Sequence, residues 1–219
     1  MLYSEDLASE YTNKRKSYAE NDNVLVNAIE SVGVMGKVVL DIGSGDGNVD
    51  QLIMKAGAAR LIGIDTSDKM VEIARSNNSD PNVSFIKADA QQLPNEDKSI
   101  DIVTTNFVLH YFIDTTPVFR EIARVLKDDG RYVGVFNITD VASGYEHLYN
   151  TQMPLRLGES VVLLNLIKSR KEVEASIDAA GLSIVKYEEL GHDNSVVDDS
   201  FPDKAHLRKA AVLMILRKK

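Results

Sequence analysis

From about Lys37 onward, short apolar runs alternate with amphipathic stretches, and this alternation restricts the possible folds more than any other feature of the sequence. Runs that are apolar on both faces indicate parallel strands covered by helices on both sides. The pattern predicts a doubly wound, mostly parallel α/β sheet of seven strands, with a helix between each of the first six. No helix precedes the last strand, so it should be antiparallel. The expected strands span residues 38–42, 61–65, 83–88, 100–105, 131–138, 182–190 and 210–216.

Two segments do not belong to this alternation of strands and helices. Residues 1–36 contain an amphipathic helix with Leu25 and Ile29 on its apolar face, and we expect this segment to cap the site. The main domain is predicted to span residues 37–219, with a long insertion at residues 139–168. Because long insertions in compact domains are commonly lids or binding loops, this one is expected to contact the substrate.

Composition narrows the class of partner. The formal net charge of −8 argues against nucleic acid and anionic membranes, since binding phosphate groups requires clustered Lys and Arg. The chain has no cysteine, which excludes disulfides, thiolate metal sites and cysteine nucleophiles. No cluster of His, Asp and Glu has metal-ligand spacing. The acidic N-terminus lacks the basic start and apolar run of a signal peptide. We therefore expect a soluble cytoplasmic protein with a small-molecule partner and no metal.

A glycine-rich turn directly follows the first predicted strand, with the sequence Asp41-Ile42-Gly43-Ser44-Gly45-Asp46-Gly47. In a doubly wound sheet, the first β–α turn is where ligands bind. A dinucleotide fingerprint would require its third glycine at position 48, which is Asn48. The acids Asp41 and Asp46 would also repel a pyrophosphate. The turn therefore favours a ligand with cationic or hydroxyl groups, although a generic tight turn explains the glycines as well.

Two further acids lie where neighbouring strands are predicted to end. Asp65 ends the second strand, where a carboxylate can accept hydrogen bonds from both hydroxyls of a ribose. Asp89 follows the third strand, where it could accept from an exocyclic adenine amine. A helix cap is the alternative for Asp65, and a surface turn is the alternative for Asp89. With Asp41, they place three acids on one edge of the sheet and predict a nucleoside site there.

These segments together resemble the class I S-adenosylmethionine-dependent methyltransferases, especially the enzymes that act on small molecules. The resemblance extends from about residue 38 to residue 138. The matching segments are residues 38–47, 61–67, 85–94, 99–110 and 124–131. The resemblance implies a Rossmann-like fold, S-adenosylmethionine as cofactor, and transfer of its methyl group to a small-molecule acceptor by in-line displacement.

The resemblance also implies which residues would contact the cofactor. The methionyl part is expected against the first glycine-rich turn, the ribose and adenine beyond the second and third strands, and the sulfonium beyond the fourth. The positions are, in that order, Asp41, Gly43, Ser44 and Gly45; Asp65, Thr66, Met70, Asp89, Ala90 and Gln91; and Asn106 and Phe107. Arg15 could pair with the methionine carboxylate, and a solvated charge explains it equally well.

Methyl transfer from a sulfonium requires alignment and exclusion of water more than covalent catalysis. A hydroxyl or acidic-carbon acceptor would also require a base, and His110 is the candidate because its unperturbed pKa is near neutrality. Structural packing is the alternative for this histidine. Two other functions stay open. One is a non-catalytic S-adenosylmethionine-binding protein, and the other is a nicotinamide-dependent oxidoreductase, which the position of Gly47 disfavours.

Overall fold

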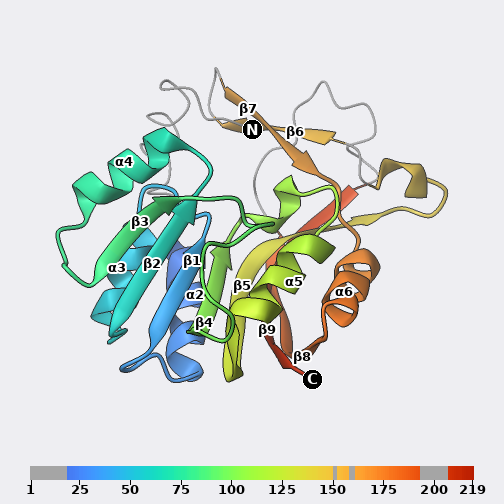
Figure 1. The fold of residues 1–219 in the computed structure, drawn as a ribbon. Helices are drawn as coiled ribbons and strands as arrows, with labels where there is room; N and C mark the ends of the chain where they lie inside the picture. Colours follow the sequence, from blue (N-terminus) through green and yellow to red (C-terminus); the bar gives the residue numbers. More distant parts are fainter. Residues whose placement is uncertain (1–18, 150–151, 158–160, 193–206) are drawn as a thin grey trace.

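The computed structural model describes residues 19–149, 152–157, 161–192 and 207–219, and within them a seven-stranded sheet forms the centre of the fold (Figure 1). The strands of this sheet are β1 (Val38–Ile42), β2 (Arg60–Asp65), β3 (Val83–Lys87), β4 (Ile100–Asn106), β5 (Leu126–Val141), β8 (Leu182–His192) and β9 (Leu207–Lys218). They lie in the order β3-β2-β1-β4-β5-β9-β8. Strands β1 to β5 pair in parallel, whereas β9 is antiparallel to both β5 and β8. The predicted doubly wound sheet with an antiparallel last strand is therefore confirmed.

Helices cover both faces of this sheet. The described helices are α2 (Ala19–Ser31), α3 (Asn48–Lys55), α4 (Asp68–Asn77), α5 (Thr116–Val125) and α6 (Arg170–Ala179). Leu25 of α2 and Ile53 of α3 share one buried cluster with Val133 of β5. Phe119 of α5 belongs to a second cluster with the neighbouring β5 residue Tyr132. Since successive side chains of a strand point to opposite faces, the two clusters form the core on the two sides of the sheet.

Local capping signals in the sequence fix where two of the helices begin. The Ser169 hydroxyl accepts a hydrogen bond from the Glu172 backbone N–H at 3.1 Å, and the Glu172 carboxylate accepts from the Ser169 N–H at 3.3 Å. This is the capping box that the spacing predicts at the start of α6. At α4, the Ser67 hydroxyl accepts from the Met70 N–H at 3.3 Å. Each cap satisfies backbone donors that the first turn of a helix leaves open.

The prediction of a helix between the third and fourth strands is wrong. Residues 88–99 run from β3 to β4 as turns, with one isolated bridge between Asp89 and Gln92. A proline at position 94 interrupts the segment, and side chains of α5 satisfy several of its backbone groups. Arg124 donates to the carbonyl oxygens of Leu93 and Asn95, at 3.0 and 2.9 Å. The segment is therefore held by side chains from outside it instead of by an internal helical ladder.

The 139–168 insertion contains regular structure that the sequence pattern does not predict. Strand β5 extends through Val141, and a short 3-10 helix, η3, spans Glu146–Leu148. Strands β6 (Gln152–Leu157) and β7 (Val161–Leu166) then pair antiparallel as a separate two-stranded sheet. Figure 1 shows this pair beyond the carboxyl ends of the central strands. No helix among the described residues is both long enough and apolar enough to cross a membrane.

Candidate functional site

The carboxyl ends of four parallel strands meet at one edge of the sheet. Strand β1 lies between β2 and β4, with Ile42 in register with Ile64 and with Thr105. Strand β3 lies outside β2, with Lys87 in register with Asp65. The segments that follow these strands are therefore neighbours along this edge. The carboxyl ends of the strands and the segments that follow them contain every cofactor residue predicted from the sequence except Arg15, which lies outside the described residues.

The turn after β1 packs directly onto the ends of β2 and β4. The backbone N–H groups of Gly43 and Ser44 both donate to the Ile64 carbonyl oxygen, at 2.7 and 2.9 Å. Gly43 has a φ of +75°, and a Cβ atom added there would lie 2.3 Å from Cγ2 of Val108. Glycine is therefore required at position 43 by backbone conformation and by contact with the loop after β4. This requirement exists whether or not a ligand is bound.

Asp65 joins the ends of β1 and β2. Its Oδ1 accepts a hydrogen bond from the Ser67 backbone N–H at 2.8 Å, and its Oδ2 accepts from the Gly45 N–H at 3.2 Å. Desolvation raises the pKa of this carboxyl group, although the same N–H groups act in the opposite direction. The side chain caps the turn, but the hydroxyl that caps helix α4 belongs to Ser67. Each Asp65 oxygen retains acceptor capacity for a further donor, such as a ribose hydroxyl.

The turn after β3 presents Asp89 to solvent. Its Oδ1 accepts from the Gln91 backbone N–H at 2.8 Å, and the Gln92 N–H donates to the Asp89 carbonyl oxygen at 3.0 Å. Both Asp89 and Gln91 are exposed, whereas Ala90 between them is buried. The surface-turn alternative thus describes the local geometry correctly. It does not exclude a ligand, because a carboxylate can accept several hydrogen bonds at once.

The two predicted adenine contacts beside β2 differ in exposure. Thr66 is exposed, whereas Met70, which belongs to α4, is buried with 1% of its surface accessible. The neighbouring Ser44 hydroxyl is also buried, and its oxygen has no hydrogen-bond partner within the described part of the chain. A buried hydroxyl without a partner is costly unless a ligand or water supplies one. The glycine-rich turn therefore contains a polar atom suited to a ligand.

The end of β4 is tied to the N-terminal helix. The Asn106 side-chain Nδ2 donates to Oδ1 of Asp22 in α2 at 2.8 Å. The next residue, Phe107, has a φ of +56°, and its N–H donates to the Val135 carbonyl oxygen at 2.7 Å. A non-glycine residue in this region is strained by about 1–3 kcal/mol, and such residues cluster at functional sites. Sequence reasoning missed Asp22, because nothing in one sequence pairs it with a residue so far along the chain.

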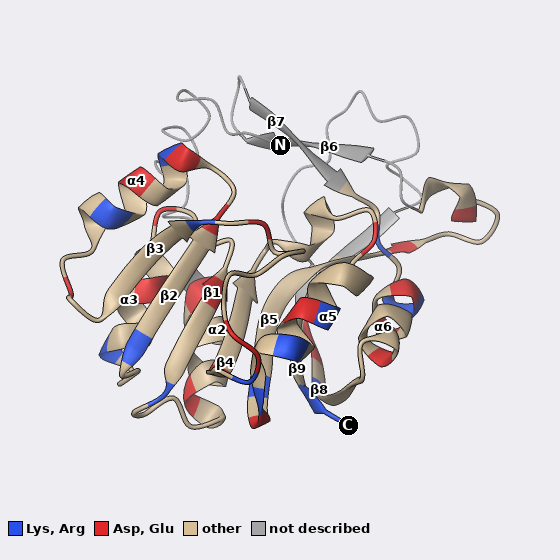
Figure 2. Cartoon of the chain, viewed as in Figure 1, with Lys and Arg blue, Asp and Glu red and all other residues tan. Residues whose placement is uncertain are grey.

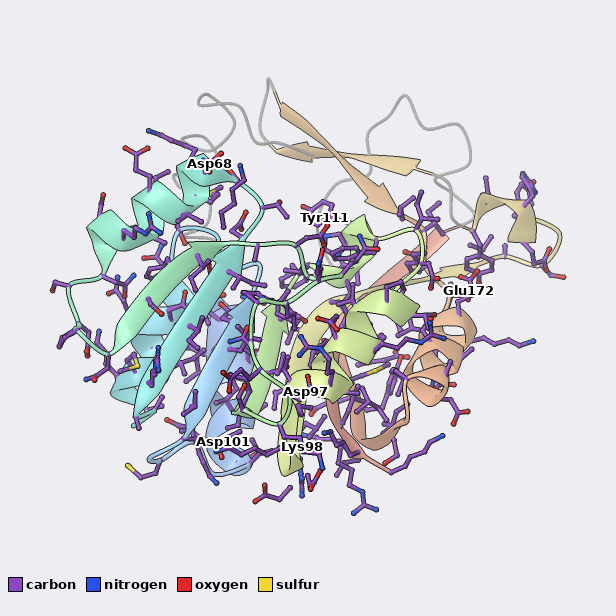
Figure 3. The ribbon with its side chains drawn as sticks, in the orientation of Figure 1. Asp68, Asp97, Lys98, Asp101, Tyr111 and Glu172 are labelled. Atoms are coloured by element: carbon purple, nitrogen blue, oxygen red, sulfur yellow. The ribbon has the colours of Figure 1, made fainter. Side chains whose placement is uncertain are left out.

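His110 lies in a 3-10 helix, η2 (Leu109–Tyr111), at the same edge. Its ring centroid is 4.4 Å from that of Tyr111 and 6.4 Å from that of Phe107. Only 3% of the histidine surface is accessible. Figure 3 shows Tyr111 at the end of the fold that faces β6 and β7. The histidine is thus close to the Phe107 turn but packed among aromatic rings, as its structural alternative predicts.

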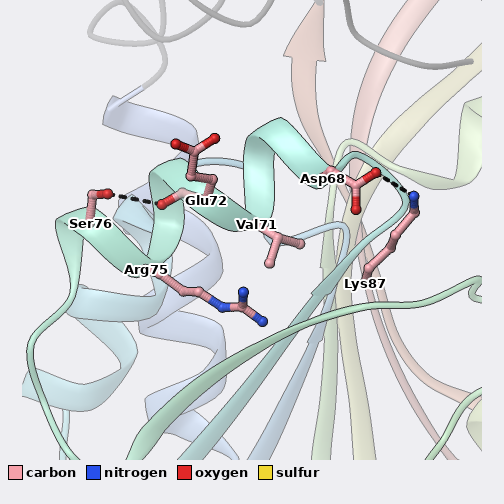
Figure 4. Close-up of a pocket in the computed structure, with 6 residues that line it drawn as sticks. All are labelled: Asp68, Val71, Glu72, Arg75, Ser76 and Lys87. Carbon is pink, nitrogen blue, oxygen red and sulfur yellow. Dashed lines mark hydrogen bonds and ion pairs between the residues drawn. The ribbon is translucent and has the colours of Figure 1, made fainter.

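A hollow of about 560 Å³ lies between α4 and the edge strand β3 (Figure 4). It is lined by Asp68, Val71, Glu72, Arg75, Ser76 and Lys87. Lys87 forms an ion pair with Asp68, and Nη2 of Arg75 donates to the Phe85 carbonyl oxygen at 2.6 Å. Arg75 thereby covers an acceptor that an edge strand leaves open. None of the cofactor residues predicted from the sequence lines this hollow.

The site residues fit S-adenosylmethionine by their chemistry. The cofactor is a nucleoside with a ribose diol and a positively charged sulfonium. The edge provides carboxylates at Asp41, Asp65 and Asp89, and the buried Ser44 oxygen lies within the glycine-rich turn. No cluster of three or more His, Asp and Glu side chains with metal-binding geometry occurs among the residues described here.

Comparisons with known proteins indicate a methyltransferase domain. Residues 40–134 match a family model described as a methyltransferase domain. The demethylmenaquinone methyltransferase of Thermotoga maritima is 43% identical over 96 residues, which cover 43% of this chain and 41% of that protein. An S-adenosylmethionine-dependent methyltransferase from Mesorhizobium loti has a similar structure, with a TM-score of 0.63 at 20% identity over 88% of this chain and 96% of that one.

The same fold also occurs in the [4+2]-cyclase SpnF, with a TM-score of 0.69 at 20% identity over 90% of this chain and 81% of that one. The chain spans about two fifths of the length of the first curated relatives that it matches. The matched domain contains the carboxyl end of β1, all of β2 to β4 and the turns that bear the candidate site. Residues 40–134 thus form a methyltransferase domain, and the sheet around them has the fold of the class I S-adenosylmethionine-dependent methyltransferases.

Proposed function

We propose that this chain binds S-adenosylmethionine and transfers its methyl group to a small-molecule acceptor. The observation that carries the proposal is the Asp65 carboxylate at the end of β2. It is fixed by N–H groups of Gly45 and Ser67, at 3.2 and 2.8 Å, beside a glycine-rich turn. A carboxylate held in this way is suited to a ribose diol, and its turn lies within the matched methyltransferase domain.

The bound cofactor supplies an activated methyl group on a sulfonium. The protein then has to align the donor with the acceptor and exclude water, which can contribute about 7–11 kcal/mol to lowering the barrier. In this proposal Gly43, Ser44 and Gly45 line the methionyl part, with Asp41 orienting their turn. Arg15, outside the described residues, pairs with the methionine carboxylate.

The remaining contacts in this proposal follow the order of the strands. Asp65 binds the ribose hydroxyls, Asp89 accepts from the adenine amine, and Asn106 lies beside the path of methyl transfer. Five further residues complete the contacts with the adenine and the sulfonium. Thr66, Met70, Ala90 and Gln91 lie around the adenine, and Phe107 lies near the sulfonium.

An acceptor that reacts through a hydroxyl or an acidic carbon must lose a proton during transfer. His110 is the residue that we propose for this step, because it lies at the same edge and close to the Phe107 turn. Its burial among aromatic rings would fix the orientation of the ring toward one acceptor position. An acceptor that reacts through a neutral amine would not depend on this histidine as a base before transfer.

The acceptor is proposed to be a free metabolite bound beside β4 and β5, with the 139–168 insertion acting as a lid and the segment before residue 37 as a cap. The acidic composition supports a small molecule over nucleic acid. Figure 2 shows acidic and basic residues interspersed on α4, α5 and α6, an arrangement that does not favour a polyanion. A cytoplasmic location fits the absence of cysteine and remains part of the proposal.

A non-catalytic or differently catalytic S-adenosylmethionine-binding protein is the second candidate. The observation that favours it is the shared fold of the cyclase SpnF, since a fold does not by itself determine the reaction. The nicotinamide-dependent oxidoreductase is weaker. Gly47, with a φ of +76°, is the N-cap of α3, and position 48, where a dinucleotide fingerprint would have its third glycine, is Asn48, the first residue of that helix.

One incubation, together with binding titrations of S-adenosylhomocysteine and NADH, separates these candidates. The protein is mixed with S-adenosylmethionine labelled in its methyl group and with a metabolite extract, and labelled products are identified by mass spectrometry. Transfer of label to a small molecule is the expected result. Cofactor binding without transfer to any metabolite would support the second candidate. Binding of NADH without binding of S-adenosylhomocysteine would refute the proposal.

A further inference from the structure

A pair of side chains on α5 holds the connection between β3 and β4. Leu93 lies in this connection with its side chain buried in the core cluster of α5. Its backbone N–H donates to Oε2 of Glu121 at 2.7 Å, and its carbonyl oxygen accepts from Nη2 of Arg124 at 3.0 Å. Both polar backbone groups of one residue are therefore bound by two side chains of the same helix. Neither bond belongs to the sheet or to a helix ladder.

The Arg124 guanidinium binds four groups at once. It forms two parallel hydrogen bonds to the Glu121 carboxylate, Nε to Oε1 at 2.7 Å and Nη2 to Oε2 at 2.8 Å. Nη1 donates to the Asn95 carbonyl oxygen at 2.9 Å and to Oδ1 of Asp97 at 2.7 Å. Figure 3 shows Asp97 near the end of the fold opposite Tyr111, so the contacts follow the connection away from the carboxyl edge.

This pair is stronger than an ordinary surface ion pair. Bidentate arginine–carboxylate contacts are short and geometrically specific. The Glu121 and Arg124 side chains are only 19% and 31% exposed. The hydrogen bond from Arg124 lowers the pKa of Glu121 more than burial raises it, and the Leu93 N–H acts in the same direction as the arginine. Glu121 is therefore charged at neutral pH and bound on both sides.

We propose that Glu121 and Arg124 are positioning residues for the adenine side of the cofactor site. The proposal rests on the proposed function, in which the turn at Asp89 contacts the adenine. The Asp89 turn is directly connected to Leu93, because the Gln92 N–H donates to the Asp89 carbonyl oxygen and the side chains of Ala90 and Leu93 share one core cluster. Loss of the contacts that Glu121 and Arg124 make with Leu93 should therefore displace the Asp89 turn.

Arg124→Ala removes every contact of the guanidinium while leaving the turn residues unchanged. Loss of one hydrogen bond to the charged Asp89 weakens binding about 10- to 100-fold, and we expect a 10- to 100-fold weaker affinity for S-adenosylhomocysteine. The affinity for 5′-methylthioadenosine should fall by the same factor, because this nucleoside retains adenine and ribose but lacks the amino-acid part. Calorimetric titration measures both affinities, and circular dichroism with thermal unfolding measures the fold.

Arg170→Ala is the matched control. Arg170 on α6 also forms an ion pair, with Glu174 at 2.7 Å, and contacts the Tyr187 ring, but it lies away from the β3–β4 connection. It should lower thermal stability without changing either affinity. Arg124→Lys retains the charge but not the fork of donors, and should give an intermediate loss. Glu121→Gln retains an oxygen for the Leu93 N–H and should also be intermediate.

Each outcome decides one proposal. If the wild-type protein does not bind S-adenosylhomocysteine, the proposed function is wrong. If the wild type binds and the folded Arg124→Ala variant binds both nucleosides within twofold of it, only the positioning role is overturned. A loss confined to S-adenosylhomocysteine also overturns it, since it would indicate the methionyl side. Should Arg124→Ala not fold, Arg124→Lys and Glu121→Gln are judged by the same criteria.

Discussion

Asp65→Asn is the substitution that probes the cofactor site most sharply. The carboxylate accepts from the Ser67 N–H through Oδ1 and from the Gly45 N–H through Oδ2, at 2.8 and 3.2 Å. An amide of the same shape has only one oxygen, so its NH₂ group must face one of these donors or one ribose hydroxyl. The substitution therefore removes charge and one acceptor while changing the volume of the side chain very little.

The size of the effect follows from these contacts. A hydrogen bond to a charged group contributes about 1.5–3 kcal/mol, and the proposed site forms such bonds to both ribose hydroxyls. The amide retains one of the two, so binding should weaken by about 1.5–3 kcal/mol, or about 10- to 100-fold. Because the Asp65 carboxylate joins the turn after β1, through the Gly45 N–H, to the turn after β2, through the Ser67 N–H, thermal stability should also fall slightly.

Calorimetric titration with S-adenosylhomocysteine measures this change. Asp68→Asn is the matched control, because Asp68 lies in the first turn of α4 with its side chain 77% exposed and pairs only with the exposed Lys87 among the described residues. It should leave the affinity unchanged. Equal affinities of the wild type and Asp65→Asn, within twofold, would refute the assignment of Asp65 to the ribose.

Three further predictions test local features of the site and fold. Gly43→Ala should lower the free energy of unfolding by about 1–3 kcal/mol, measured in urea, because its φ is +75° and the new Cβ meets Val108; Val108→Ala should restore part of the loss. Ser169→Ala should cost about 1 kcal/mol in the same assay and leave nucleoside affinity unchanged, since only the cap of α6 is lost. Affinity for S-adenosylhomocysteine should fall as the pH decreases through the raised pKa of Asp65, because ribose hydroxyls bind the charged form. Titrations across pH should show this loss beginning above the ordinary aspartate value of 3.8, and a pH-independent affinity would contradict it.

Features that are determined by short stretches of sequence were predictable. The capping box of Ser169 and Glu172 and the turn at Gly43 to Gly47 both depend on residues close together in the chain. The resemblance to the methyltransferase class is confirmed by the matched domain and the fold. The acids Asp65 and Asp89 lie at the predicted edge, because parallel strands place their carboxyl ends together.

Features that depend on distant residues were not predictable from one sequence. The Asn106–Asp22 hydrogen bond and the Arg124 contacts join segments that share no local pattern. The helix expected between β3 and β4 is absent because the Arg124 and Glu121 side chains satisfy backbone groups of that segment. The β6–β7 pair was missed because Asn165 interrupts the apolar run that forms β7.

Backbone hydrogen exchange with and without saturating S-adenosylhomocysteine tests the candidate site most directly. Binding at the carboxyl edge should slow exchange in three separate segments, residues 43–47, 65–67 and 89–92. Amides at the amino-terminal ends of the parallel strands, such as those of Val38 and Ser99, should exchange at the same rate with and without the ligand. Unchanged exchange in all three segments, or slowing confined to the hollow between α4 and β3, would contradict the assignment of the nucleoside to this edge.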